Sequence, residues 1–329
     1  MRIAILGAGA WGTALACALA GRREVALWAR RPEHASQLNQ ERSNLRYLPG
    51  VVLAPSIVIT GELAQAVRFA SGGLLALATP TAALRATLQA LRSIGELPPV
   101  LWLSKGFERD SRMLPHEIVG DEIPGHPAGP LSGPSFADEV ARGLPTALTV
   151  GGSAAFCAQV TRTLHGDALR IYSTQDVIGV EVGGAVKNVM AIGTGIADAL
   201  GLGNNGRAAL ITRGLAEITR LGVALGGRAE TFTGLTGLGD LILTCTGELS
   251  RNRRVGLALG RGTELQQALA ELGHVAEGVW SAPATAARAR QTGVEMPITN
   301  AVCAVLDGQL TPRAALERLL ARGPRNESA

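Results

Sequence analysis

The sequence predicts two domains, a doubly wound α/β domain over residues 1–178 and an all-helical domain over residues 179–329. Three observations support this: the chain length, the alternation of short apolar runs with helix-like segments in the first half, and the absence of strand signals in the second. At 329 residues the chain can form two domains of about 100–200 residues each. It is 47% hydrophobic and 18% charged, which excludes a largely disordered chain.

Short apolar runs recur through the first half, with helix-like segments such as Trp11–Ala20 and Thr81–Leu91 between them. Runs that are apolar throughout are typical of strands buried on both faces, as in a parallel sheet covered by helices. The expected strands are Ile3–Leu6, Val25–Trp28, Ile57–Ile59, Leu74–Ala78, Val100–Ser104, Ala128–Ser132, Ala147–Val150 and Leu169–Ile171.

The pattern changes after about Tyr172, where strand signals end and Gly or Pro separates successive helical segments. This change places the domain boundary within Gln175–Gly179. The expected helices are Val180–Leu200, Arg207–Leu225, Arg251–Gly260, Thr263–Leu272, Ser281–Thr292, Pro297–Leu306 and Thr311–Ala321, before a frayed tail at Gly323–Ala329.

Charge and cysteine usage exclude several classes of protein. The net charge of +4 is modest and the basic pairs are scattered, which argues against nucleic-acid binding. The uncharged stretch 3–21 is interrupted by glycines and leads into another apolar run, so it predicts a strand, turn and helix rather than a signal peptide or membrane span. The spacing of the cysteines and histidines does not match a metal site. We expect the cysteines to be free thiols in a reducing cytoplasm. The cysteines are Cys17, Cys157, Cys245 and Cys303.

A glycine-rich loop, GAGAWG at positions 7–12, joins the first expected strand to the first expected helix. In this context Gly7 permits a tight turn, Gly9 lets the backbone approach a pyrophosphate, and Gly12 allows close packing of helix on strand. The helix N-terminus adds unpaired N–H groups and partial positive charge. A second expected strand about 20 residues further on completes the context of a Rossmann-like dinucleotide-binding domain.

The residues after that second strand indicate which dinucleotide binds. NAD-preferring domains place a carboxylate there for the ribose hydroxyls, whereas this chain has Arg30 and Arg31. Two guanidinium groups could bind a 2′-phosphate and stack on adenine. The alternative is a solvated pair at a helix start before Pro32. We expect NADP to be accepted and NAD also to be used, and the sequence does not give the preference between them.

Only two of the 31 basic residues are lysines, Lys105 and Lys187. Lys105 follows the fifth expected strand, at the sheet edge where open α/β domains bind ligands. Lys187 lies in the apolar helix that opens the second domain, where burial would lower its pKa and suit it to proton transfer. Chance survival of two surface lysines is the alternative, but both fall where the two domains should meet.

Three further stretches have the residue types of a substrate site. Ser132–Ala137 is a Gly-Pro turn after a strand, Thr233–Asp240 is glycine-rich and ends in a carboxylate, and Ser250–Asn252 is a helix N-cap followed by a basic residue. The last combination suits a phosphate group. Each stretch alone is more simply a structural turn or cap. Together, beside a cofactor domain and two lysines, they favour a small phosphorylated substrate.

The chain resembles the bacterial NAD(P)-dependent glycerol-3-phosphate dehydrogenase family over nearly its whole length. The resemblance implies reversible reduction of dihydroxyacetone phosphate to sn-glycerol 3-phosphate, which feeds phospholipid synthesis. The motifs that carry it are GAGAWGTALA, ATPTAALR, SKGFE, LSGPSFADEVARGLPTA, GGAVKNVMAIGTGIADALGLG, AALITRGLAEI, TGLTGLGDLILTCTGELSRNRRVGLALGRG and AEGVWSA.

The resemblance also implies roles for single residues. Lys187 matches the family's proton-transferring lysine, and Lys105 matches a lysine that touches both cofactor and substrate. Ala10 stands at a cofactor contact where the family usually has Ser, and Asn204-Asn205 replaces a usual Asp-Asn. Matches to other substrate contacts are Gly133, Ser135, Asp240, Ser250, Arg251 and Asn252. Matches to other cofactor contacts are Trp11, Arg30, Arg31, Ala137, Val275 and Glu277, with Arg251 shared.

Two other functions remain open at this point. A two-domain reductase acting on a carboxylate substrate would also use an arginine anchor. A non-catalytic NAD(P)-sensing regulator would keep the glycine loop, but it has no need for Lys105, Lys187 and Asp240 together. The sequence does not give the oligomeric state, and a homodimer is one option.

Overall fold

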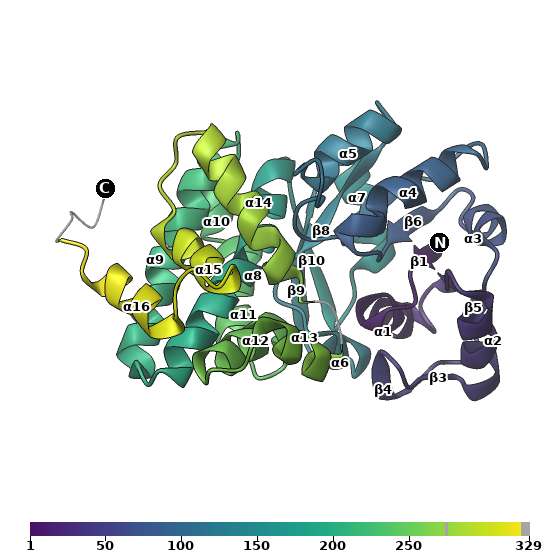
Figure 1. Cartoon of the computed structure of the whole chain (residues 1–329). Helices are drawn as coiled ribbons and strands as arrows, with labels where there is room; N and C mark the ends of the chain where they lie inside the picture. Colours follow the sequence, from purple (N-terminus) through teal and green to yellow (C-terminus); the bar gives the residue numbers. More distant parts are fainter. Residues whose placement is uncertain (274–275, 324–329) are drawn as a thin grey trace.

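The computed structural model describes residues 1–273 and 276–323. Figure 1 shows an open sheet with its helices at one end of the molecule and a helical half at the other. The last strand of the sheet ends at Thr174, and the first helix of the second half begins at Val177. The predicted α/β domain followed by an all-helical domain is confirmed. The six C-terminal residues of the expected tail, and Val275, lie outside the described residues.

The main sheet has eight strands in the order β10-β9-β8-β7-β6-β1-β2-β5. All eight expected strands form within a few residues of their predicted limits. Their bounds are β1 Arg2–Leu6, β2 Glu24–Trp28, β5 Val58–Thr60, β6 Leu74–Leu77, β7 Val100–Trp102, β8 Ala128–Ser132, β9 Thr146–Gly151 and β10 Leu169–Thr174.

One pairing differs from the expected parallel arrangement. β9 runs antiparallel to β8, with Leu131 opposite Val150, while every other neighbouring pair in this sheet of described residues is parallel. The connection from β8 to β9 contains only the short helix Ala137–Ala141. At about 1.5 Å per residue this helix is too short to return the chain to the starting edge of the sheet.

A small hairpin beside the glycine loop was not predicted. Strands β3 (Ser43–Asn44) and β4 (Leu48–Val52) pair antiparallel and form a separate two-stranded sheet. The sequence signal is weak because β3 has two residues and β4 contains Pro49 and Gly50, which are depleted in strands. Figure 1 shows this hairpin below α1 and beside α2.

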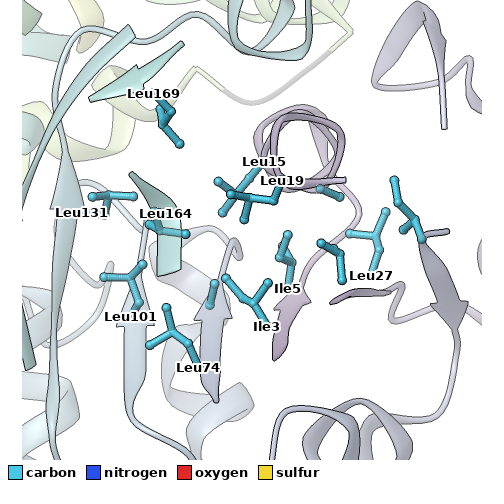
Figure 2. Close-up of a cluster of buried hydrophobic side chains, with 14 of the residues drawn as sticks. Ile3, Ile5, Leu15, Leu19, Leu27, Leu74, Leu101, Leu131, Leu164 and Leu169 are labelled. Carbon is cyan, nitrogen blue, oxygen red and sulfur yellow. The ribbon is translucent and has the colours of Figure 1, made fainter. Parts of the chain in front are cut away.

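Helices cover both faces of the main sheet. Leu15 and Leu19 of α1 and Leu164 of α7 meet Ile3, Ile5 and Leu101 from the strands in one buried cluster (Figure 2). The helices of this half are α1 Ala10–Leu19, α2 Pro32–Glu41, α3 Leu63–Phe69, α4 Thr81–Arg92, α5 Pro115–Glu122, α6 Ala137–Ala141 and α7 Ala154–Leu164.

The second half is built around the 23-residue helix α8, Val177–Ala199. This helix is long and apolar enough to span a membrane, but 83% of its most apolar window is buried inside the protein, so it is a core helix. The other helices are α9 Gly203–Ala224, α10 Ala229–Phe232, the π-helical turn η1 Leu235–Gly239, α11 Asp240–Thr246, α12 Arg251–Gly260, α13 Leu265–Leu272, α14 Glu277–Gln291, α15 Pro297–Leu306 and α16 Pro312–Leu320.

The seven predicted helices of this half all form, but three short elements were missed. They are α10, η1 and α11, which follow one another between Ala229 and Thr246. Glycines at 234, 237 and 239 hid them, because glycine is a poor helix former and reads as a turn. This segment delivers Asp240 to the domain junction.

Candidate active site

The glycine loop has the geometry that its sequence predicts. Gly7 has φ +122°, and a Cβ there would lie 2.7 Å from the carbonyl oxygen of Ala78. A Cβ on Gly12 would lie 2.0 Å from the carbonyl oxygen of Gly7, so only glycine allows this approach of α1 to the strand. A Cβ on Gly9, in contrast, would have no neighbour within 4 Å. The space beside Gly9 is open to a ligand.

The start of α1 suits an anionic group. Gly9 is the N-cap, and no side chain caps the helix. Its first N–H groups therefore keep their partial positive charge for a ligand. Thr79, which follows β6 beside the loop, has a buried hydroxyl oxygen without a hydrogen-bond partner among the described residues. These features fit the phosphates of a dinucleotide. Ala10 can contribute only its backbone N–H to such a site, because its side chain has no polar group.

Two lysines from different halves of the molecule hold one buried carboxylate. Lys105, just after β7, donates from Nζ to Oδ2 of Asp240 at 2.8 Å. Lys187, on α8, donates from Nζ to the other oxygen, Oδ1, at 2.5 Å, and to Oγ1 of Thr244 at 2.9 Å. The side chains of Lys187 and Asp240 are 9% and 1% exposed. Neither lysine is a free surface residue.

This arrangement sets the charge of each group. Burial lowers the pKa of Lys187 to about 8, with Lys105 adding to the effect while Asp240 opposes it. Burial would raise the pKa of Asp240, but the charges of Lys105 and Lys187 outweigh it and hold that pKa below its usual value. Near neutral pH the site thus contains an ionised carboxylate and an ammonium group poised to lose a proton.

Hydrogen bonds connect the glycine loop to this cluster without interruption. Trp11 donates from Nε1 to the carbonyl oxygen and hydroxyl of Ser135, at 3.2 and 3.3 Å. Ser135 donates to the carbonyl oxygen of Gly133 at 3.1 Å, and Lys105 reaches the same oxygen at 3.5 Å. From Lys105 the path continues through Asp240 to Lys187. The structure thus brings the expected cofactor loop and the expected proton donor into one network.

The start of α12 joins the site from the helical half. Ser250 caps the helix by accepting from the backbone N–H of Arg253 at 3.3 Å. Asn252 donates to Oδ1 of Asn188, the neighbour of Lys187, and accepts from the N–H of Gly278, both at 2.9 Å. The side chain of Arg251 is exposed. The Ser250 cap satisfies one N–H of this helix start, and the remaining N–H groups, with an arginine beside them, can bind a phosphate group.

The other predicted residues within the described part of the chain lie at or next to the ends of helices and strands. Glu277 starts α14, where burial raises its pKa although the charges of Arg251, Lys105 and Lys187 act to lower it. Ala137 starts α6, which packs against α1. Arg30 and Arg31 are exposed just after β2. The position of Val275 falls outside the described residues.

Several residues at the junction were not predicted. Thr244 lies one helical turn after Asp240, a spacing that could have indicated it. Asn188 adjoins Lys187 in sequence. Glu181 on α8 accepts hydrogen bonds from Trp102 and His116 of the other half at 2.8 and 2.9 Å. No local pattern indicates that last contact, because its members come from three separate elements.

Nothing in the described residues suggests a metal site. No group of three or more His, Cys, Asp or Glu within residues 1–273 and 276–323 could hold a metal ion. All four cysteines are free thiols. Burial raises the pKa of the Cys245 thiol to about 12, so it stays protonated at neutral pH.

A dinucleotide-binding sheet whose ligand edge meets a buried lysine–carboxylate cluster defines a nicotinamide-dependent oxidoreductase of two domains. Comparison with known proteins identifies the family. Models described as the N-terminus and the C-terminus of NAD-dependent glycerol-3-phosphate dehydrogenase match residues 2–157 and 176–317. The chain belongs to the NAD-dependent glycerol-3-phosphate dehydrogenase family, and the resemblance inferred from its motifs is confirmed.

Similar proteins match over their whole length. Glycerol-3-phosphate dehydrogenase [NAD(P)+] from Janthinobacterium sp. (strain Marseille) is 58% identical, with 100% of both chains covered. The protein of the same name from Dechloromonas aromatica is 54% identical at the same coverage. The crystal structure of glycerol-3-phosphate dehydrogenase from Coxiella burnetii has a TM-score of 0.93 and 41% identity, covering 98% of this chain and 99% of that one.

Proposed function

We propose that the protein catalyses the reversible NAD(P)H-dependent reduction of dihydroxyacetone phosphate to sn-glycerol 3-phosphate, supplying glycerophospholipid synthesis. The observation that carries this proposal is the hydrogen-bond path from the glycine loop through Lys105 and Asp240 to Lys187. It supports residues 1–178 as the part that binds the dinucleotide, and residues 179–329 as the part that supplies the proton donor and the substrate's phosphate site.

The chain's own residues supply the proton and the orientation. The reduced nicotinamide, when bound, supplies hydride to the ketone carbon. Lys187 gives a proton to the oxygen that becomes negative in that step, and takes it back in the reverse reaction. Asp240 holds the Lys187 ammonium and, with Lys105, orients the substrate hydroxyl. Gly133 and Ser135 border the substrate site next to Lys105.

The substrate's phosphate binds at the start of α12 in this proposal. Ser250, Arg251 and Asn252 surround the helix N-terminus, where N–H groups and a guanidinium favour a dianion. Asn252 keeps one amide hydrogen for the substrate after donating the other to Asn188. Arg251 also contacts the cofactor in this proposal, as do Trp11, Ala137 and Glu277.

We propose NADP as the preferred cofactor and NAD as an accepted one, because two arginines stand where a carboxylate would favour NAD. Arg30 and Arg31 bind the 2′-phosphate. A cytoplasmic location is supported by four free cysteines and by the burial of α8. A homodimer remains a proposal, to be tested by light scattering.

The test follows the absorbance of NADPH, and then of NADH, with dihydroxyacetone phosphate and with 2-keto acids that carry a carboxylate instead of a phosphate. Turnover only with the phosphorylated ketone supports the proposal. Preference for a keto acid would establish the carboxylate reductase instead, and tight cofactor binding without turnover of either would indicate a regulator.

Arg251→Ala isolates the phosphate site. We expect kcat/KM for dihydroxyacetone phosphate to fall by about tenfold to a hundredfold, because a charge-assisted contact contributes about 1.5–3 kcal/mol. Unphosphorylated dihydroxyacetone should be affected much less. Equal losses for the two ketones would contradict the assignment of the phosphate to this helix start.

A further inference from the structure

The hairpin β3–β4 brings a second set of basic groups beside the dinucleotide loop. We propose that Arg46 and His34 bind the 2′-phosphate of NADP together with Arg31, so that the hairpin helps to determine cofactor selectivity. This inference rests on the proposed function for the identity of the cofactor. It adds two residues to the site, one from α2 and one from the turn between β3 and β4.

Asn44 fixes the hairpin to the glycine loop. Its side chain is buried, and Nδ2 donates to the carbonyl oxygen of Ala8 at 3.0 Å and to Oγ1 of Thr13 at 2.7 Å. Ala8 belongs to the loop and Thr13 to α1. The residues that follow Asn44 are therefore held at a defined place beside the adenosine end of the loop, where β2 and α2 meet.

His34 and Arg46 both lie at this anchored turn. Nε2 of His34 lies 3.4 Å from Oδ1 of Asn44. The imidazole ring is tilted against the ring of Tyr47, with 5.6 Å between their centroids. The guanidinium carbon of Arg46 lies 5.2 Å from the centroid of the same tyrosine. Tyr47 thus contacts both basic side chains, and one of them, His34, lies in the first turn of α2.

The two charged groups that shift the pKa of His34 are both positive. Burial lowers the pKa of His34, and the charges of Arg31 and Arg46 lower it further, while a hydrogen bond with Asn44 opposes them. No carboxylate contributes to that balance. Within the described residues, neither Arg31 nor Arg46 forms an ion pair with Asp or Glu, unlike Arg85 or Arg253. Bringing an anion here would relieve the repulsion.

The position of the cluster indicates which anion it binds. The residues after β2 lie beside the ribose of the adenosine in dinucleotide-binding domains. NAD offers only hydroxyl groups there, whereas NADP offers a phosphomonoester with up to two negative charges. Arginine binds such a group through two parallel N–H bonds, and a histidine beside it can add a third donor. The 2′-phosphate is the part of NADP that matches these donors.

The experiment uses the full-length enzyme and variants Arg46→Gln and His34→Gln. Isothermal titration calorimetry measures binding of 2′,5′-ADP, which carries the 2′-phosphate, and of 5′-AMP, which lacks it. We expect Arg46→Gln to weaken 2′,5′-ADP binding by about tenfold or more, and His34→Gln by a smaller factor, with 5′-AMP unchanged. In steady-state assays the KM for NADPH should rise while the KM for NADH stays constant.

Arg68→Gln is the matched control, because Arg68 is an exposed residue of α3 and its loss removes the same charge. It should leave both binding constants unchanged. If Arg46→Gln and His34→Gln also leave 2′,5′-ADP binding within twofold of the wild type, the proposal is wrong. A different result would separate the two proposals. If the wild type binds 2′,5′-ADP, Arg46→Gln does not, and the wild type reduces no phosphorylated ketone, then the 2′-phosphate site is supported and the proposed function is wrong.

Discussion

Asp240 and Glu181 are both buried carboxylates at the junction of the two halves, yet their pKa values shift in opposite directions. Their side chains are 1% and 2% exposed. Both accept hydrogen bonds from the sheet side, Asp240 from Lys105 and Glu181 from Trp102. The pKa of Asp240 is lowered, whereas burial raises that of Glu181 despite its hydrogen bonds to His116 and Trp102.

The difference lies in the charge of the partners. Two ammonium groups compensate Asp240, so its ionised form is favoured in spite of burial. Glu181 has a neutral indole, a backbone N–H and one imidazole, and that imidazole must hold a proton to balance it. Burial alone therefore does not identify a functional carboxylate. The number of full charges beside it is what separates Asp240, to which we assign a role in the reaction, from Glu181, which bonds the two halves together.

The strongest test of this comparison removes Lys187, the proposed proton donor. Lys187→Ala should lower kcat by about a hundredfold to ten-thousandfold, because it deletes a general acid. Affinity for the cofactor, measured by quenching of protein fluorescence with NADPH, should stay near that of the wild type. Lys187→Arg should not restore activity, because arginine does not release its proton. An unchanged kcat in Lys187→Ala would remove this residue from the chemistry.

Removing the carboxylate should have the next largest effect. Asp240→Asn removes the negative charge and one of the two oxygens that hold the lysines, and we expect kcat to fall by about a hundredfold. Asp240 raises the pKa of Lys187, so this pKa should be lower in the variant. The residual rate of ketone reduction should therefore begin to fall at a lower pH than in the wild type. Rate–pH profiles of the variant check this. A loss of rate without any acidic shift would contradict the coupling between the two groups.

The wild-type pH profile tests the charge state directly. In the proposed mechanism ketone reduction requires protonated Lys187, whose pKa is about 8, so kcat/KM should be constant below that pH and fall tenfold per unit above it. Alcohol oxidation requires the neutral amine, so its kcat/KM should rise up to about pH 8 and then level off. A reduction profile that falls above about pH 8, together with an oxidation profile that rises below it, would support the assignment. Profiles that change with pH in the same direction would refute it.

The smallest effect on catalysis is expected at the other carboxylate. Glu181→Gln should destabilise the protein by about 1–3 kcal/mol, because glutamine keeps one acceptor oxygen for Trp102 but leaves the His116 imidazole without its carboxylate partner. The fall in kcat/KM above about pH 8 should not move. Thermal unfolding measures the first effect and a rate–pH profile the second. Glu24→Gln, in an exposed pair with Arg2, should leave both unchanged. A displaced pH limb in Glu181→Gln would make this group part of the proton-transfer site.

Local patterns predicted much of this molecule. The spacing of Gly7, Gly9 and Gly12 matches the turn, open space and close packing found in the structure. The scarcity of lysine singled out Lys105 and Lys187, which meet at one carboxylate. The antiparallel direction of β9 and the turn η1 were not predicted. No periodicity in the sequence indicates either feature, because both depend on the length or packing of neighbouring segments.

The sequence alone determined the dinucleotide loop, the division into sheet and helices, and the residue types available for proton transfer, since spacing and side-chain chemistry carry that information. Tertiary structure decided which charges meet. Asp240 is 53 positions from Lys187 and 135 from Lys105, and the sheet and α8 bring all three together. The pKa of each group depends on burial and on those distant neighbours, so it exists only in the folded protein.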